Sequence, residues 1–226
     1  SGQKVLVVSK GIEASSGRFL NEIYAAHVPS DKIAFLSGPS FAVEVQKSLP
    51  TALVVNATNE TLSKEFASLF PSFIKAYTST DVVGAEVAGA YKNVIAIAAG
   101  ICEGLGLGNN AAAALISRGL VEMQRFGVFY GAEVDTFTGL GGAGDLFLTA
   151  SSTMSRNFRV GLGLAKGKSQ EEILEELGEV AEGIGTSYAL HEISKTKNLY
   201  LPIAKEVYEM LEGKNPQASL KDLLSQ

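Results

Sequence analysis

Lys92 is the residue whose surroundings point most directly to chemistry. It is the only charged residue between Val87 and Cys102, within a run of alanine, glycine, valine and isoleucine. A helix that is apolar on nearly every face should be buried, and a buried ammonium group is costly unless it is paired or loses its proton. Burial also lowers the pKa of a lysine, which suits it to proton transfer. The alternative is a lysine that extends to solvent at a domain edge, and the pattern leaves both open.

Polar groups gather in four further segments that suit a small anionic ligand. Ser155-Arg156-Asn157 stands at an expected helix start, where backbone N–H groups and a forked guanidinium favour phosphate or carboxylate. Asp145 follows a glycine-rich stretch; local sequence favours an ordinary N-cap, yet the glycines also permit close approach of a ligand. Ser37–Ala42 and Lys10-Gly11 follow expected strands, at the sheet edge where α/β proteins bind ligands. For the segments other than Asp145, a solvated cap or a plain turn remains an open alternative.

The glycine-rich stretch itself, Gly139–Gly144, satisfies the pattern G-x-G-x-x-G. A dinucleotide loop needs a preceding strand and a surrounding βαβ unit, and neither is expected here. We therefore do not expect this segment to bind a pyrophosphate.

The elements that must position these residues change in kind near residue 80. Before that point, apolar strand-like runs alternate with helical patterns, which indicates an α/β sheet whose strand directions the sequence leaves open. The expected strands are 5–8, 33–36, 52–55 and 73–78, and the expected helices are 11–26, 41–49 and 60–70.

After Thr80 the pattern is helical only. The expected helices are 81–104, 109–130, 145–152, 156–165, 169–177, 186–196 and 203–212. Ser169 and Glu172 form a capping-box pattern at the start of one of them. We predict an α/β part at residues 1–79 followed by an all-α part at residues 80–226.

Composition excludes several classes of function. The chain has 226 residues and a net charge of −5, without the lysine and arginine cluster that a nucleic-acid binder needs. One cysteine and two histidines make a disulfide or zinc site unexpected, and the low thiol content favours a cytoplasmic protein. The nearly uncharged stretch 87–102 is shorter than the ~20 residues that span a bilayer, and no signal-peptide pattern is present. We therefore expect no metal, no nucleic acid and no membrane span.

Taken together, the segments resemble the bacterial-type NAD(P)-dependent glycerol-3-phosphate dehydrogenase family. The matching stretches are Ser9–Glu13, Ser37–Ala42, Glu86–Ile95, Gly139–Leu146, Ser155–Asn157, Glu179–Gly183 and Leu201–Ile203. They occur in the family's order along essentially the whole chain. The resemblance implies the C-terminal part of a Rossmann-like NAD(P)-binding domain followed by an all-α substrate-binding and catalytic domain.

The resemblance also implies an activity and roles for individual residues. The reaction would be the reversible hydride transfer between sn-glycerol 3-phosphate and dihydroxyacetone phosphate, with NAD or NADP as cofactor. Its product would feed glycerophospholipid synthesis, and the enzyme would be a homodimer. Lys92 would be the catalytic proton donor and acceptor. The implied substrate contacts are Lys10, Gly38, Ser40, Lys92, Asp145, Ser155, Arg156 and Asn157. The implied cofactor contacts are Lys10, Ala42, Arg156, Val180 and Glu182.

One departure from the family pattern and two alternatives accompany this interpretation. Family members begin with a strand and a glycine-rich turn that holds the pyrophosphate, and no such pattern precedes Lys4, so we expect this chain alone not to bind the nucleotide. One alternative is another hydroxyacid dehydrogenase with a helix-borne lysine, against which Asp145 and the segment 155–157 argue. The other is a non-catalytic dimerisation or binding module.

Overall fold

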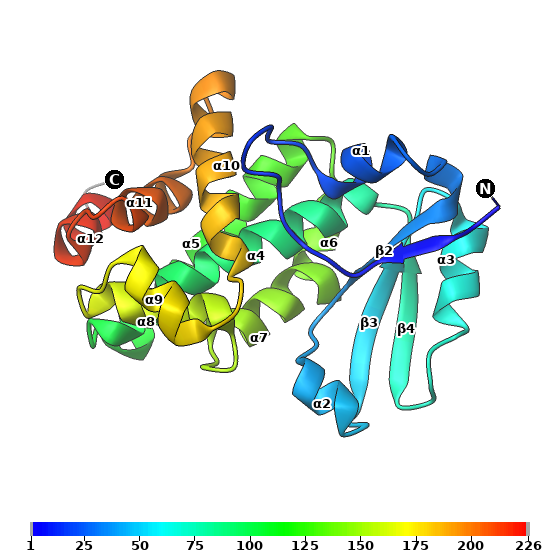
Figure 1. The fold of residues 1–226 in the computed structure, drawn as a ribbon, viewed down its shortest axis with the longest axis horizontal. Helices are drawn as coiled ribbons and strands as arrows, with labels where there is room; N and C mark the ends of the chain where they lie inside the picture. Colours follow the sequence, from blue (N-terminus) through cyan, green and yellow to red (C-terminus); the bar gives the residue numbers. More distant parts are fainter. Residues whose placement is uncertain (1, 225–226) are drawn as a thin grey trace.

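The computed structural model describes residues 2–224, apart from the side chains of residues 220, 221 and 224. Figure 1 shows a small sheet at one end of the molecule and a group of helices at the other. The strands are β1 (Val5–Val7), β2 (Ile33–Ser37), β3 (Thr51–Asn56) and β4 (Ile74–Ser79), in the order β1-β2-β3-β4. The β1–β2 and β3–β4 pairs are parallel and the β2–β3 pair is antiparallel. The α/β interpretation is confirmed, and the strand direction that the sequence left open is mixed.

Both faces of the sheet are covered by apolar side chains. On one face, α3 (Glu60–Ala67) places Leu62 against Val55 and Ala34. On the other face, Val7 and Phe35 belong to a cluster that includes the beginning of the next long helix. The sheet is thereby packed against the start of the long helix that follows it.

The helices after the sheet surround α4 (Val82–Gly104), which runs through the centre of the molecule in Figure 1. Around it lie α5 (Gly108–Phe129), α6 (Val134–Thr138), a π-helical turn (Leu140–Gly144), α7 (Asp145–Ala150), α8 (Arg156–Ala165), α9 (Gln170–Leu177), α10 (Glu182–Lys197), α11 (Pro202–Leu211) and α12 (Pro216–Leu224). Asp81 caps α4, with its Oδ1 accepting the N–H of Gly84 at 2.8 Å.

The length and composition of α4 would allow it to cross a bilayer, but 94% of its most apolar stretch is buried against the chain's other elements. That burial is what the core helix of a folded domain shows. Two glycines bring α4 and α8 into contact, because a Cβ at Gly161 would lie 2.0 Å from the carbonyl oxygen of Ile97 and one at Gly100 would lie 2.1 Å from that of Phe158. The backbones of α4 and α8 are therefore in direct contact at these two glycines.

The helix expected at 11–26 is wrong over most of its length. Only α1 (Leu20–Ala25) is helical there, and the residues before it form a loop closed by a bridge between Ile12 and Phe19. Gly11 and Gly17 have φ values of 140° and 69°, which a right-handed helix cannot include. The apolar spacing that imitated a helix instead places Ile12 and Phe19 in the core.

The other elements differ from expectation mainly at their ends. The helix expected at 41–49 is the shorter α2 (Ala42–Gln46), since Ser48 adopts a φ of 54° just before Pro50. The helix expected at 60–70 ends at Ala67, and the one expected at 186–196 begins at Glu182. The sequence analysis missed α6, the π-helical turn, α12 and a short 3-10 turn at Ser30–Lys32. The helix at 156–165 and the capping box at Ser169 are confirmed.

Candidate active site

Lys92 is buried and paired, so of the two alternatives the buried one holds. The residue is 7% exposed, and its Nζ lies 2.5 Å from Asp145 Oδ1 and 3.1 Å from Thr149 Oγ1. Asp145 and Thr149 are one turn apart on α7, which therefore offers two oxygen atoms to the same ammonium group. This contact joins α4 to α7 at the centre of the helical part.

Asp145 does not cap its helix. Gly144 occupies the N-cap position, and Asp145 is the first helical residue, 1% exposed. Its Oδ2 accepts a hydrogen bond from Lys10 Nζ at 2.9 Å, while its Oδ1 binds Lys92. One carboxylate thus lies between two ammonium groups, and the three side chains carry a net positive charge.

The pKa of Lys92 is lowered to about 8 by its surroundings. Burial is the largest cause, because it penalises the charged ammonium form, and the positive charge of Lys10 adds to the effect. The carboxylate of Asp145 acts in the opposite direction. A lysine with this pKa populates both its charged and its neutral form near neutral pH, as a group that both gives and takes a proton must.

The segment Ser155–Asn157 opens α8, and two of its side chains serve the fold. Ser155 is the N-cap, with its Oγ accepting the N–H of Phe158 at 3.3 Å. Asn157 is buried and its Oδ1 accepts the N–H of Gly183 at 2.8 Å, which ties α8 to the beginning of α10. The sequence left a helix cap and a ligand contact open for this segment, and in the structure Ser155 Oγ and Asn157 Oδ1 both have partners within the protein.

Arg156, between them, is paired with two carboxylates across the start of α10. Its Nη2 lies 2.9 Å from Glu182 Oε1 and its Nη1 lies 3.5 Å from Glu179 Oε2. Arg159, one turn further along α8, binds Glu179 Oε1 at 2.6 Å. The side chain of Arg156 is 38% exposed, so its guanidinium group stays accessible to a ligand.

These groups line one cleft with a volume of about 660 Å³. Of the residues expected at a site, it brings together Lys10, Ser40, Ala42, Lys92, Asp145, Ser155, Arg156, Asn157 and Glu182. Four cationic and three acidic side chains line it, so the cleft is positive overall and favours an anionic ligand.

Two expected residues lie outside the described lining of this cleft. Gly38 has a φ of 112° and lies where a Cβ would come within 3.1 Å of the Ala52 carbonyl oxygen, so it allows the chain to turn after β2. Val180 is 72% exposed, between α9 and α10. Among residues 139–144, Gly141 packs against Ser37 and Gly142 against the backbone of Phe137, which accounts for their lack of side chains.

The polar side chains of the cleft that were not among the expected site residues include Thr149, Arg159 and Glu179. Spacing could have found the first two, because Thr149 follows Asp145 by four positions and Arg159 follows Arg156 by three, within helices that the sequence predicts. Glu179 begins the matching stretch Glu179–Gly183, but its spacing gives it no role, because the packing of the α9–α10 connection brings it to the cleft.

Comparison with known proteins places this chain in a family. Residues 1–63 match the family described as NAD-dependent glycerol-3-phosphate dehydrogenase N-terminus, and residues 81–221 match its C-terminus. A relative from Sulfurimonas denitrificans named glycerol-3-phosphate dehydrogenase (NAD(P)+) is 76% identical over 225 residues, which cover 100% of this chain and 76% of the relative. One from Campylobacter lari with the same name is 60% identical, covering 99% and 74%.

A solved structure gives the same result in three dimensions. The crystal structure of glycerol-3-phosphate dehydrogenase from Coxiella burnetii matches with a TM-score of 0.93 and 36% identity, over 100% of this chain and 70% of the other. The two family halves meet between residues 63 and 81, where the last strand gives way to α4. By sequence along its whole length and by fold, the chain belongs to the NAD-dependent glycerol-3-phosphate dehydrogenase family.

Proposed function

We propose that the cleft is the active site in which sn-glycerol 3-phosphate and dihydroxyacetone phosphate are interconverted with NAD or NADP. The observation that carries this proposal is the contact of buried Asp145 with both buried Lys92 and half-buried Lys10, at one cleft that also holds Arg156. Membership of the family supports the reaction, and it counts against both alternatives, another hydroxyacid dehydrogenase and a non-catalytic module.

Lys92 is the group that moves the proton. In the direction of ketone reduction its ammonium form donates a proton to the oxygen that becomes a hydroxyl group, and in the reverse direction its neutral form accepts that proton. Asp145 holds Lys92 in place and supports its charged form, and Lys10 adds a second positive charge where negative charge develops on the substrate oxygen.

Arg156 is the anchor for the phosphate group. A phosphate dianion carries more charge than the carboxylates of Glu179 and Glu182 and presents oxygens that a guanidinium group binds in pairs. The substrate therefore competes with those carboxylates for Arg156. Ser40, Ser155 and Asn157 line the same space, and Gly38 sets the turn that brings Ser40 to it.

The residues present fit the nicotinamide end of NAD or NADP. A cleft of about 660 Å³ exceeds what a three-carbon phosphate requires and lies within the ~300–1,000 Å³ range of small-molecule sites. Ala42, at the start of α2, and Glu182, at the start of α10, would hold the cofactor together with Lys10, Arg156 and Val180. When bound, the nicotinamide supplies or accepts the hydride.

Four broader features complete the proposal. The chain divides near residue 80 into a partial NAD(P)-binding part and a helical catalytic part, since the last strand ends at Ser79 and α4 begins at Val82. Val121, Val128 and Phe129 leave apolar surface exposed on α5, which supports a homodimer through the helices. The product serves glycerophospholipid synthesis in the cytoplasm, in keeping with the activity of the family.

A substrate panel tests the proposed function. The protein to use is this chain joined to the part of its relatives that it does not match, called here the extended enzyme. We expect oxidation of NADH or NADPH with dihydroxyacetone phosphate, and much slower oxidation with unphosphorylated hydroxyketones and 2-keto acids. A preference for an unphosphorylated substrate would overturn the proposal, because Arg156 would then have no phosphate to bind.

A further inference from the structure

Glu86 is a buried carboxyl group for which the proposed chemistry has no use. It lies on α4, six positions before Lys92, and is 7% exposed. Its Oε1 accepts the N–H of Asn21 at 2.8 Å, in the first turn of α1. Its Oε2 is buried and has no hydrogen-bond partner among the described residues. Burying a carboxyl group with one oxygen unpaired costs free energy, so its position calls for a structural or functional explanation.

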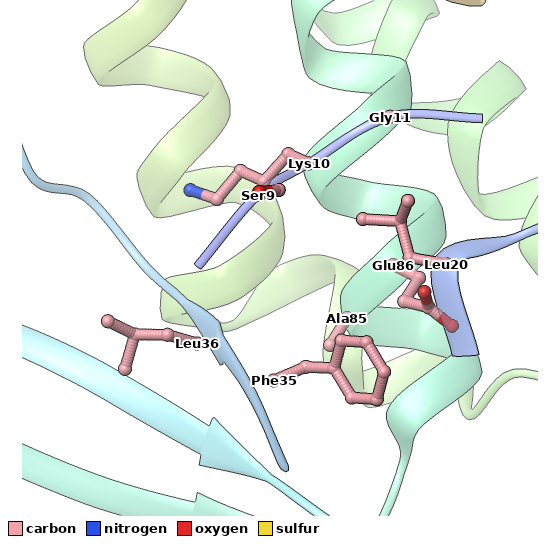
Figure 2. Close-up of a pocket in the computed structure, with 8 residues that line it drawn as sticks. All are labelled: Ser9, Lys10, Gly11, Leu20, Phe35, Leu36, Ala85 and Glu86. Atoms are coloured by element: carbon pink, nitrogen blue, oxygen red, sulfur yellow. The ribbon is translucent and has the colours of Figure 1, made fainter. Parts of the chain in front are cut away.

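The carboxyl group faces the segment that carries Lys10. Figure 2 shows a small pocket where Glu86 and Leu20 lie near the backbone of Ser9, Lys10 and Gly11, with the side chain of Lys10 directed away from Glu86. The chain leaves this pocket at Gly11 and returns to it at Leu20, after the bridge between Ile12 and Phe19 closes the loop. Glu86 therefore binds the returning end of a loop whose other end is Lys10.

A glycine one turn along α4 receives the side chain of Lys10. A Cβ at Gly89 would lie 3.3 Å from both Cγ and Cδ of Lys10, so the lysine stem packs directly on the helix backbone there. Glu86, Gly89 and Lys92 follow one another at intervals of three, so each is a neighbour of the next on the surface of α4. From this position Lys10 reaches Asp145, which Lys92 approaches from the other direction.

We propose that Glu86 is a positioning residue for Lys10: its carboxyl group fixes the start of α1 against α4, so that the stem of Lys10 lies on Gly89 and its ammonium group reaches Asp145. This inference rests on the proposed function, because the contact between Lys10 and Asp145 matters only in that site. Burial, reinforced by Glu22 of α1, raises the pKa of Glu86 to about 8. The group is therefore mainly neutral near pH 7, and its task is hydrogen bonding rather than charge.

The test measures kcat/KM for dihydroxyacetone phosphate in the extended enzyme. Glu86→Leu introduces an apolar side chain of similar size and removes the acceptor for the Asn21 N–H. We expect it to lower kcat/KM by about 10- to 100-fold, as a displaced catalytic group does. Glu86→Gln keeps the acceptor and should restore activity close to that of the unchanged enzyme. Glu103→Leu, an exposed glutamate on the same helix, is the matched control and should have little effect.

A double-mutant cycle separates positioning of Lys10 from general damage to the fold. Because Glu86 acts through Lys10, Glu86→Leu should cause little further loss in an enzyme that already carries Lys10→Ala. The inference would be overturned if Glu86→Leu lowered kcat/KM by the same factor with Lys10 present and with Lys10→Ala. It would also be overturned if Glu86→Leu left kcat/KM unchanged. If Glu86→Leu does not fold, Gly89→Ala displaces the Lys10 stem from the other side, and its loss must likewise vanish with Lys10→Ala. If the extended enzyme without any substitution had no activity with dihydroxyacetone phosphate, the proposed function itself would be overturned, and the inference with it.

Discussion

Lys92 and Asp145 meet with 2.5 Å between Nζ and Oδ1, although 53 positions separate them in the chain. The contact depends on α7 beginning at Asp145, immediately after a π-helical turn built from glycines. The two oxygens of this carboxylate are divided between Lys92 on α4 and Lys10 after β1. Asp145 therefore holds together two cationic side chains that come from distant parts of the chain.

Replacing Lys92 should abolish proton transfer without disrupting the fold. In the extended enzyme, Lys92→Met keeps much of the stem volume, and we expect kcat to fall by about 10²–10⁴-fold. Because the pKa of Lys92 is about 8, the unchanged enzyme should oxidise glycerol 3-phosphate faster as pH rises toward that value, and reduce dihydroxyacetone phosphate more slowly above it. Steady-state rates across pH 6–10 measure both limbs.

The variant should lose both limbs of this pH profile. The control is Lys195→Met, which removes an exposed lysine paired with Glu192 on α10. Should Lys92→Met keep more than about a tenth of kcat, well outside the loss expected for a general acid, Lys92 does not carry the proton. Lys10 would then be the next residue to replace.

Arg156 should distinguish substrates by their phosphate group. We expect Arg156→Ala in the extended enzyme to raise KM for dihydroxyacetone phosphate and to lower kcat/KM by ~2 kcal/mol or more, roughly 30-fold, as expected for a lost charge-assisted hydrogen bond. The penalty should shrink for dihydroxyacetone, which has no phosphate. Arg125→Ala is the control, since Arg125 binds the Tyr200 carbonyl oxygen on another face. Equal penalties with both substrates would mean that Arg156 serves the cofactor or the fold.

Asn157 should contribute to stability independently of any ligand. Asn157→Ala leaves the buried N–H of Gly183 without its acceptor, and we expect the free energy of unfolding of this chain to fall by ~1–3 kcal/mol. Asn157→Asp keeps an acceptor at the start of α10, where negative charge is favoured, and should lose less. Urea denaturation followed by circular dichroism measures both, with the exposed Asn109→Ala as control. Equal stability of the two alanine variants would contradict the prediction.

Glu86 should make the chain less stable as pH rises. Its pKa is about 8 in the fold and near 4.5 in the unfolded chain, so the folded state binds more protons between these values. The stability that Glu86 provides is complete below about pH 4.5 and is lost progressively as pH rises toward about 8. Glu22 faces it from α1, and Lys10 lines the same pocket.

Glu86→Gln cannot ionise, so its stability relative to the unchanged chain should increase across that pH window and then level off. Urea midpoints at half-unit pH intervals measure the difference. Glu103→Gln, exposed on the same helix, should leave the pH dependence unchanged. Parallel curves for the unchanged chain and for Glu86→Gln would show that Glu86 is ionised in the fold throughout.

Much of this architecture could be predicted because short sequence patterns determine where its helices lie and begin. The apolar run around Lys92 indicated a buried helix, and the capping residues marked where Asp81 and Ser169 open helices. The loop before α1 could not be predicted in the same way. Its apolar residues are spaced as in a helix, but the left-handed conformations at Gly11 and Gly17 direct them to the core from a loop.

The partners within the site were harder to predict than its members. Residue types and the family resemblance indicated Lys92, Asp145 and Arg156 one by one. That Asp145 binds two lysines, and that Arg156 is engaged by Glu179 and Glu182, depends on how separate helices pack. Short-range spacing carries no information on such contacts. For the same reason the sequence indicated no separate role for Glu86, which is only the first residue of the matching stretch Glu86–Ile95.

The placement of Glu86, Gly89 and Lys92 on one rigid helix sets a limit on changes of chain length. An α-helix turns by about 100° per residue, so inserting or deleting a single residue between positions 86 and 92 would rotate Lys92 away from Asp145 while Glu86 stayed against α1. Adding a whole turn would restore the direction of Lys92 but would move it by about 5.4 Å along the helix axis, away from Asp145. The number of residues between Glu86 and Lys92 must therefore stay constant wherever the reaction is kept.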